Sequence, residues 1–154
     1  AGDSLDVSGP VGAFHAQPTP REMVFIGGGV GMAPLRAMIH QELGRGTERR
    51  IRYFYGARSA ADLFYAEEFD ALAAAHGNFD WTVALSDPDV GADWDGARGF
   101  IHQVVWERYL RDHPAPQDCE YYLCGPPMMI AAVLQMLDEL GVEPAQIFND
   151  DFGV

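Results

Sequence analysis

One segment constrains the fold more than any other: a strand pattern that runs into a glycine-rich loop and then into a helix pattern. Residues 23–26 form a continuous apolar run, which is typical of a strand buried on both faces of a sheet. The loop at 27–34 holds four glycines and ends on a proline. Apolar residues then recur at helical spacing between Leu35 and Leu43. This order of strand, tight loop and helix is how a parallel α/β sheet begins.

The same alternation continues along the chain and sets the predicted fold class. Helices of about ten to fifteen residues between strands imply right-handed crossovers in a parallel sheet. We therefore predict an α/β, Rossmann-like three-layer domain with a five-stranded parallel sheet. Ser59 and Asp62 are expected to cap the second helix, and residues 87–99 are expected to form a polar loop. The predicted strands are 23–26, 51–55, 79–85, 121–124 and 146–148.

The first twenty residues differ in pattern from the rest. Residues 5–12 alternate briefly and then break on glycine and proline, like the last strand of another unit. Residues 16–20 carry two prolines, as linkers often do. We expect residues 1–20 to be the tail of a preceding domain and a linker, residues 21–154 to form the nucleotide-binding domain, and the chain to be a fragment.

Composition excludes several classes of function. The net charge is −13 with no lysine, which argues against binding nucleic acid or anionic lipid by charge. The longest apolar runs are too short for a membrane span. Two cysteines cannot staple a disulfide scaffold, so a soluble domain in a reducing, cytoplasmic setting is expected. The five histidines show no ligand spacing, so no metal site is expected, and Cys119 is given no role.

The unusual residues gather where strands are expected to end. In open parallel sheets, ligands bind outside the carboxyl ends of the strands. A glycine loop at a helix start offers backbone N–H groups to phosphates, although glycines can also serve a purely structural turn. On the binding hypothesis, Gly31→Val should keep the fold and abolish NADH binding. The candidate cofactor-binding residues are Gly28, Gly29, Val30, Gly31, Met32, Ala33, Pro34, Gly56, Ala57, Arg58, Ser86, Asp87, Gly125, Pro126, Pro127 and Met128.

Two further features have two interpretations each. Cys124 ends a predicted strand, where its thiol could face a cleft, but free cysteines are more often small core residues. The chain ends on residues 149–154, which include Phe152. That aromatic ring could belong to a frayed terminus, or it could cover a planar cofactor.

Together these motifs resemble the ferredoxin–NADP reductase superfamily, in which a nucleotide domain follows a flavin-binding barrel. They are more closely similar to the F subunits of sodium-pumping NADH:quinone reductases, over nearly the whole chain. The segments that carry this resemblance are Phe25 to Pro34, Tyr55 to Ser59, Ala84 to Pro88, Trp94 to Gly96, Gly99 to His102, Cys119 to Tyr122, Cys124 to Met129 and Asp150 to Gly153.

The resemblance implies a chemistry for the parent protein. There NADH gives a hydride to FAD, electrons pass to a [2Fe–2S] centre, and a complex in the bacterial inner membrane reduces ubiquinone and exports Na⁺. The implied partners are the protein's own FAD domain and the other subunits, with this domain on the cytoplasmic face. Three catalytic positions are implied: Cys124 beside the nicotinamide, Phe152 over the flavin and Asp150 near the flavin. The alternatives are a soluble oxygenase or flavin reductase, and a non-enzymatic α/β interaction module.

Two departures from the family pattern matter. Neither the flavin-binding motifs nor a C-x4-C-x2-C cluster motif is found in the sequence, so this chain alone is expected to hold neither FAD nor iron–sulfur. Arg58 follows the second strand, where an acid would favour NADH and an arginine could accept the 2′-phosphate of NADPH. Asp62 or Glu67 could supply the acid. The preference for NADH thus rests on the resemblance.

Overall fold

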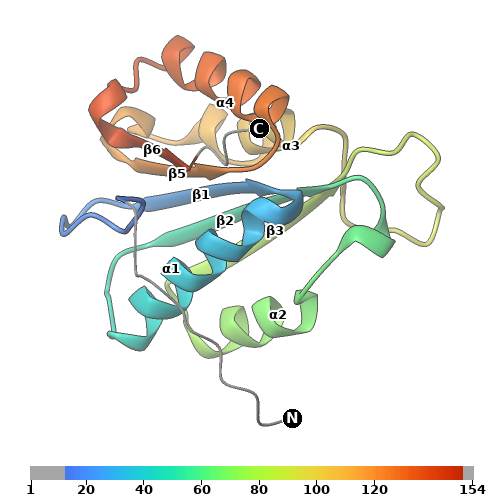
Figure 1. The fold of residues 1–154 in the computed structure, drawn as a ribbon, viewed down its shortest axis with the longest axis horizontal. Coiled ribbons are helices and arrows are strands. Elements are labelled where there is room, and N and C mark those ends of the chain that lie inside the picture. Colours follow the sequence, from blue (N-terminus) through green and yellow to red (C-terminus); the bar gives the residue numbers. More distant parts are fainter. Residues whose placement is uncertain (1–12, 151–154) are drawn as a thin grey trace, which may run out of the picture.

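The computed structural model describes residues 13–150 and shows a sheet with helices on both faces (Figure 1). Helices α1 (Met32–Gly44) and α2 (Ala66–Ala75) cover one face. Helices α3 (Ile101–Arg108) and α4 (Pro127–Glu139) cover the other. The predicted three-layer α/β architecture is therefore confirmed.

The sheet is parallel throughout, with strand order β4-β3-β2-β1-β5-β6. The chain runs outward from β1 to β4 and then crosses back to place β5 on the other side of β1. This reversal makes the gap between the carboxyl ends of β1 and β5 the topological switch point, where ligands of such sheets bind. The strands are β1 Met23–Gly28, β2 Ile51–Ala57, β3 Phe79–Leu85, β4 Ala97–Arg98, β5 Glu120–Cys124 and β6 Ile147–Asp150.

Two apolar cores, one on each face, hold the layers together. Met23, Phe25 and Tyr53 face α1 and α2, whereas the alternate residues Val24 and Ile26 face α3 and α4. All six residues of β1 are buried, which explains the continuous apolar run that identified this strand. Five short 3₁₀ helices complete the secondary structure of residues 13–150: η1 Gly29–Gly31, η2 Ala60–Asp62, η3 Leu110–Asp112, η4 Pro116–Asp118 and η5 Pro144–Gln146.

The predicted number of strands is wrong, because the sheet formed by residues 13–150 has six strands instead of five. The additional strand is β4, two residues long, inside the segment expected to be a polar loop. The guanidinium of Arg98 donates hydrogen bonds to the carbonyls of Val90, Gly91 and Trp94, and Trp94 Nε1 donates to the carbonyl of Ala97. These side-chain hydrogen bonds hold the short strand in place. The strand could not be predicted, because hydrogen bonds of this kind leave no apolar periodicity in the sequence.

The predicted cap of the second helix is also wrong. Ser59 and Asp62 form a capping box, but that box closes the 3₁₀ helix η2. Helix α2 begins after Tyr65, which has the left-handed φ of 59°. The sequence predicted one helix that begins near Ser59, whereas the structure has the short helix η2 first and α2 after it.

The end of the predicted linker packs against the domain. Phe14 lies 6.4 Å from the ring of Tyr122, and the backbone N–H of Gln17 donates to the Tyr122 hydroxyl at 2.9 Å. Arg49 reaches the Gln17 carbonyl at 2.8 Å and the buried Glu120 carboxylate at 2.6 Å. Residues 14–20 are therefore fixed to this domain, whereas the strand expected at 5–12 lies outside the described residues.

Candidate functional site

Two loops meet at the switch point. The loop after β1 and the loop after β5 touch backbone to backbone: a Cβ on Gly125 would lie 3.0 Å from the amide nitrogen of Gly28. A Cβ on Gly31 would lie 2.1 Å from the carbonyl oxygen of Cys124. Gly29 differs, because it has a φ of +54° and open space around its Cβ position. Gly31 and Gly125 therefore allow the two loops to approach, and Gly29 provides the left-handed turn.

Each loop leads into a thirteen-residue helix, and both helices point their amino termini at this edge. Neither α1 nor α4 has a side-chain cap, and neither carries an acidic residue in its first turn. The first N–H groups of a helix and its dipole give that end a partial positive charge. Two unneutralised positive ends at one switch point suit a doubly charged pyrophosphate.

The candidate residues fall into an exposed group and a supporting group. Val30 and Met128 are 82% and 87% exposed, at the first turns that lead into α1 and α4. Ala33, Pro126 and Pro127 are also exposed, whereas Gly28, Gly31 and Met32 are buried beneath them.

Tyr55 supports the glycine loop in a way that sequence reasoning missed. Its hydroxyl donates to the carbonyl of Gly29 at 3.2 Å, with the carbonyl of Asp62 at 3.4 Å. In the sequence, Tyr55 is indistinguishable from any other apolar residue of its strand. The carbonyl that it bonds belongs to Gly29, in the loop after a different strand, so the sequence pattern gives no sign of the contact. It ties the loop after β1 to the turn after β2.

Cys124 is fully buried at the end of β5, next to β1. Its neighbour in the sheet on the other side is Asp150 of β6. Burial raises the pKa of the Cys124 thiol to about 11, and the charge of Asp150 adds to this effect. This shift favours the neutral thiol over the reactive thiolate, as expected of a buried cysteine. Phe152, the third predicted catalytic residue, lies outside the described residues.

A cavity of about 360 Å³ opens at the carboxyl ends of β2 and β3. Arg58, beside it, is 83% exposed and its Nε lies 3.9 Å from Asp87 Oδ2. Asp62, one of the two acids suggested by the sequence, accepts hydrogen bonds from Ser59 and is not a lining residue. Asp93 and Trp94 belong to the segment 87–99 that was expected to be a polar loop, and both line the cavity. The lining residues are Ser59, Ala60, Leu85, Asp87, Asp89, Val90, Gly91, Asp93 and Trp94.

The structure thus brings the predicted residues to a single edge of the sheet, in two neighbouring groups. Gly28 to Pro34 and Gly125 to Met128 meet at the switch point. Gly56 to Arg58 and Ser86 to Asp87 lie at the ends of β2 and β3, joined by hydrogen bonds from the Ser86 and Asp87 amides to the Ala57 and Arg58 carbonyls. An extended ligand with a pyrophosphate in its middle would span both groups.

A comparison with known protein families identifies the family of this domain. The model of the oxidoreductase NAD-binding domain matches residues 25–135, from β1 into α4. The chain belongs to this family. As in the predicted resemblance, this NAD-binding domain has its glycine loop at the first strand and its second loop at the switch point.

Close relatives of this oxidoreductase NAD-binding domain occur in bacterial sodium pumps. It is 56% identical over 154 residues to the F subunit of the Na⁺-translocating NADH-quinone reductase of Pasteurella multocida, in a match that covers 99% of this chain and 38% of that protein. It is 58% identical over 153 residues to the corresponding protein of Pseudoalteromonas atlantica, again over 38% of that protein. The chain therefore spans less than half the length of the relatives it matches.

Solved structures with the same fold include a cytochrome P450 reductase and a domain of a nitric oxide dioxygenase. Amycolatopsis cytochrome P450 reductase GcoB superposes with a TM-score of 0.81 at 32% identity, covering 94% of this chain and 42% of that one. The FAD/NAD-binding domain of nitric oxide dioxygenase from Vibrio cholerae gives a TM-score of 0.77 at 31% identity, covering 94% and 56%. Within residues 13–150, none of the helices is long and apolar enough to span a membrane.

Proposed function

We propose that this domain binds NADH and presents its nicotinamide to a flavin carried by another part of the parent protein. The pyrophosphate would lie over Gly29 and Val30 at the start of α1, and the nicotinamide beside residues 125–128. The observation that carries the proposal is the direct contact of the two loops at the switch point, with two uncapped helix starts facing the same edge.

The domain's own contribution to the reaction is positioning. A hydride passes only over a short distance and in one orientation, so fixing the donor carbon accounts for much of the rate. Gly125 and the two prolines after it present a rigid backbone to the nicotinamide. Cys124, buried and neutral beneath this loop, would set the position of the ring, and Asp150 on the neighbouring strand would lie toward the flavin side. We propose the same covering role for Phe152 that the resemblance implies.

The parent protein proposed here is the F subunit of a Na⁺-translocating NADH:ubiquinone reductase. FAD would accept the hydride, and FAD and the [2Fe–2S] centre would be carried by parts of the parent outside this chain. Partners would be that FAD domain, reached through residues 1–20, and the other subunits at the cytoplasmic face of the bacterial inner membrane. Identity of 56% over 99% of the chain supports this assignment.

A soluble oxygenase reductase is the second candidate, favoured by the superposition on cytochrome P450 reductase GcoB. The sequence that precedes residue 1 in the parent gene discriminates between the two. A membrane anchor and a ferredoxin-like cysteine motif support the pump, whereas a flavin barrel alone supports the soluble reductase.

The cavity beside Arg58 gives a local reason to prefer NADH over NADPH. A dinucleotide whose pyrophosphate lies at α1 would place its adenosine ribose near the end of β2. Asp87, Asp89 and Asp93 line the cavity there, and Asp87 faces the guanidinium of Arg58 beside it. The guanidinium of Arg98 is already engaged by the carbonyls of Val90, Gly91 and Trp94. Carboxylates can accept a hydrogen bond from a ribose 2′-hydroxyl but repel a 2′-phosphate.

Calorimetric titration of the chain with NADH and with NADPH tests this proposal. We expect saturable binding of NADH and at least about tenfold weaker binding of NADPH, a difference of roughly 1.4 kcal/mol. Asp87→Asn should narrow that difference, because it removes one repelling charge and frees Arg58. Asp95→Asn is the matched control, since Asp95 lies in the same loop but not against the cavity. Preference for NADPH in the unaltered chain would contradict the assignment to the NADH-dependent pump.

A further inference from the structure

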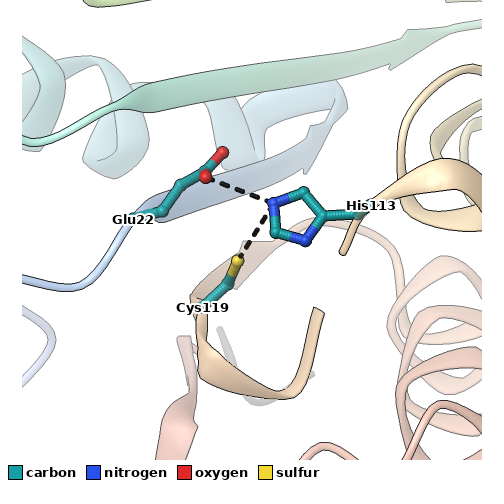
Figure 2. Close-up of side chains that lie close together, drawn as sticks. All are labelled: Glu22, His113 and Cys119. Carbon is teal, nitrogen blue, oxygen red and sulfur yellow. Dashed lines mark hydrogen bonds and ion pairs between the residues drawn. The ribbon is translucent and has the colours of Figure 1, made fainter. Parts of the chain in front are cut away.

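Three side chains able to bind a metal ion meet at the amino-terminal edge of the sheet, opposite the glycine loop. Glu22 precedes β1, Cys119 precedes β5, and His113 comes from the connection between η3 and η4 (Figure 2). Their ligand atoms all lie within 4.8 Å of one another. His113 Nε2 lies 3.3 Å from Glu22 Oε2 and 3.8 Å from Cys119 Sγ.

The cluster is enclosed and its parts are held in place. The side chains of His113 and Glu22 are 10% and 16% exposed, and Cys119 is 1% exposed. The hydroxyl of Tyr109 donates to Glu22 Oε1, which orients the carboxylate so that Oε2 faces the imidazole. Hydrogen bonds of this kind to a ligand carboxylate are typical of the surroundings of metal sites.

We propose that Glu22, His113 and Cys119 bind one zinc-like divalent ion, with water as the fourth ligand. A thiolate, an imidazole and a carboxylate form a donor set that suits Zn²⁺ and not Mg²⁺ or Ca²⁺. Ligand atoms of a tetrahedral zinc site lie about 3.3–3.8 Å apart, as the two pairs around His113 do. The remaining pair, Glu22 and Cys119, has to close by about an ångström of side-chain rotation.

Binding involves two proton movements. The backbone N–H of Ala115 donates to His113 Nδ1 at 3.2 Å, so in the metal-free chain Nε2 carries the proton. A metal at Nε2 requires that proton on Nδ1 instead, at the expense of the Ala115 hydrogen bond, which costs roughly tenfold in affinity. The Cys119 thiol, whose pKa burial raises to about 12, gives its proton to solvent as the metal takes its place.

The position of the site indicates what the ion does. It joins the starts of β1 and β5 to the segment after α3, about 20 Å from Gly28 at 3.3 Å per strand residue. The ion would therefore stabilise the fold without touching the nucleotide. The sequence predicts no metal site because residues 22, 113 and 119 show no ligand spacing, and only the pairing of β1 with β5 brings two of them together.

Titration of the 154-residue chain with Co²⁺, a spectroscopic substitute for Zn²⁺, tests the proposal directly. We expect one ion per chain, a thiolate-to-cobalt charge-transfer band in the near ultraviolet, and loss of that band when Zn²⁺ is added. The dissociation constant for Zn²⁺ should be on the order of micromolar or tighter. At a hundredfold excess over it, Zn²⁺ should raise the melting temperature by about 5–10 °C.

The two cysteines provide a matched pair of variants. Cys119→Ser should abolish the charge-transfer band and His113→Gln should weaken binding at least roughly 100-fold, whereas Cys124→Ser should keep the band. A folded, unaltered chain that gives no such band at saturating Co²⁺ would overturn the proposal, and this outcome needs no variant. A band lost in Cys124→Ser but kept in Cys119→Ser would overturn it as well. NADH binding is measured in separate titrations, so the outcome of the Co²⁺ experiment does not decide the proposed nucleotide function.

Discussion

Val30→Asp is expected to weaken the binding of NADH by about 30- to 100-fold while the chain stays folded. Val30 is 82% exposed, just before α1, and no acidic side chain occupies the first turn of that helix. A carboxylate there would lie within a few ångströms of the proposed pyrophosphate, and repulsion between them should cost about 2–3 kcal/mol. An acid at a helix start does not itself destabilise the helix.

Val30→Asn is the matched control, because it has the same shape as Val30→Asp and lacks the charge. We expect it to bind NADH within about threefold of the unaltered chain. The difference between the two variants should shrink as salt is raised, since salt screens an exposed charge. Calorimetry at low and high salt measures this difference. Equal affinities of the Asp and Asn variants at low salt would remove the pyrophosphate from the start of α1.

Gly31→Ala is expected to destabilise the chain by roughly 3 kcal/mol, lowering its melting temperature by about 10 °C. The added methyl group would lie 2.1 Å from the carbonyl oxygen of Cys124, 2.3 Å from its carbonyl carbon and 2.6 Å from the nitrogen of Gly125. All three are backbone atoms, so the loops after β1 and β5 have to separate.

Gly44→Ala adds the same methyl group at the end of α1, where nothing lies within 4 Å of it. Its stability should equal or slightly exceed that of the unaltered chain, because alanine favours the helix. Thermal unfolding of the two variants side by side measures the contrast. Similar melting temperatures for Gly31→Ala and Gly44→Ala would mean that the two loops do not touch as described.

This geometry corrects an expectation drawn from the sequence. Gly31→Val was expected to leave the fold intact and remove NADH binding, but Gly31 is buried against Cys124. Its substitution disturbs the fold whether or not the loop binds phosphate, and so cannot separate the binding hypothesis from the structural one. The exposed neighbour Val30 can.

Much of the fold could be predicted because the two central strands, β1 and β5, are buried on both faces. A continuous apolar run such as residues 23–26, bounded by a glycine loop, predicts a buried strand. The glycine loop that follows it marks the edge of the sheet proposed to bind the nucleotide. The two residues of β4 could not be found this way, since Arg98 and Trp94 hold them by hydrogen bonds to backbone carbonyls. The strand propensities of residues 97 and 98 do not reflect such contacts.

The site was predictable at the strand ends and unpredictable where it depends on packing. Glycine and proline after β1 and β5 signal both loops in the sequence. The cavity lined by Asp87 and Trp94 arises only once the loop after β3 folds back over the end of β2. The cluster of Glu22, His113 and Cys119 likewise depends on strand order, because β1 and β5 are adjacent in space but almost one hundred residues apart in sequence.

The most direct test of nucleotide binding at the switch point is an amide chemical-shift map of the chain as NADH is added. We expect the largest changes on residues 28–33 and 125–129, with smaller ones at 58–59 and 85–94, all at the carboxyl edge of the sheet. Residues 113–120, at the opposite edge, should not shift. Saturable binding whose largest shifts lie away from the two glycine-bearing loops would contradict the central claim that these loops hold the dinucleotide.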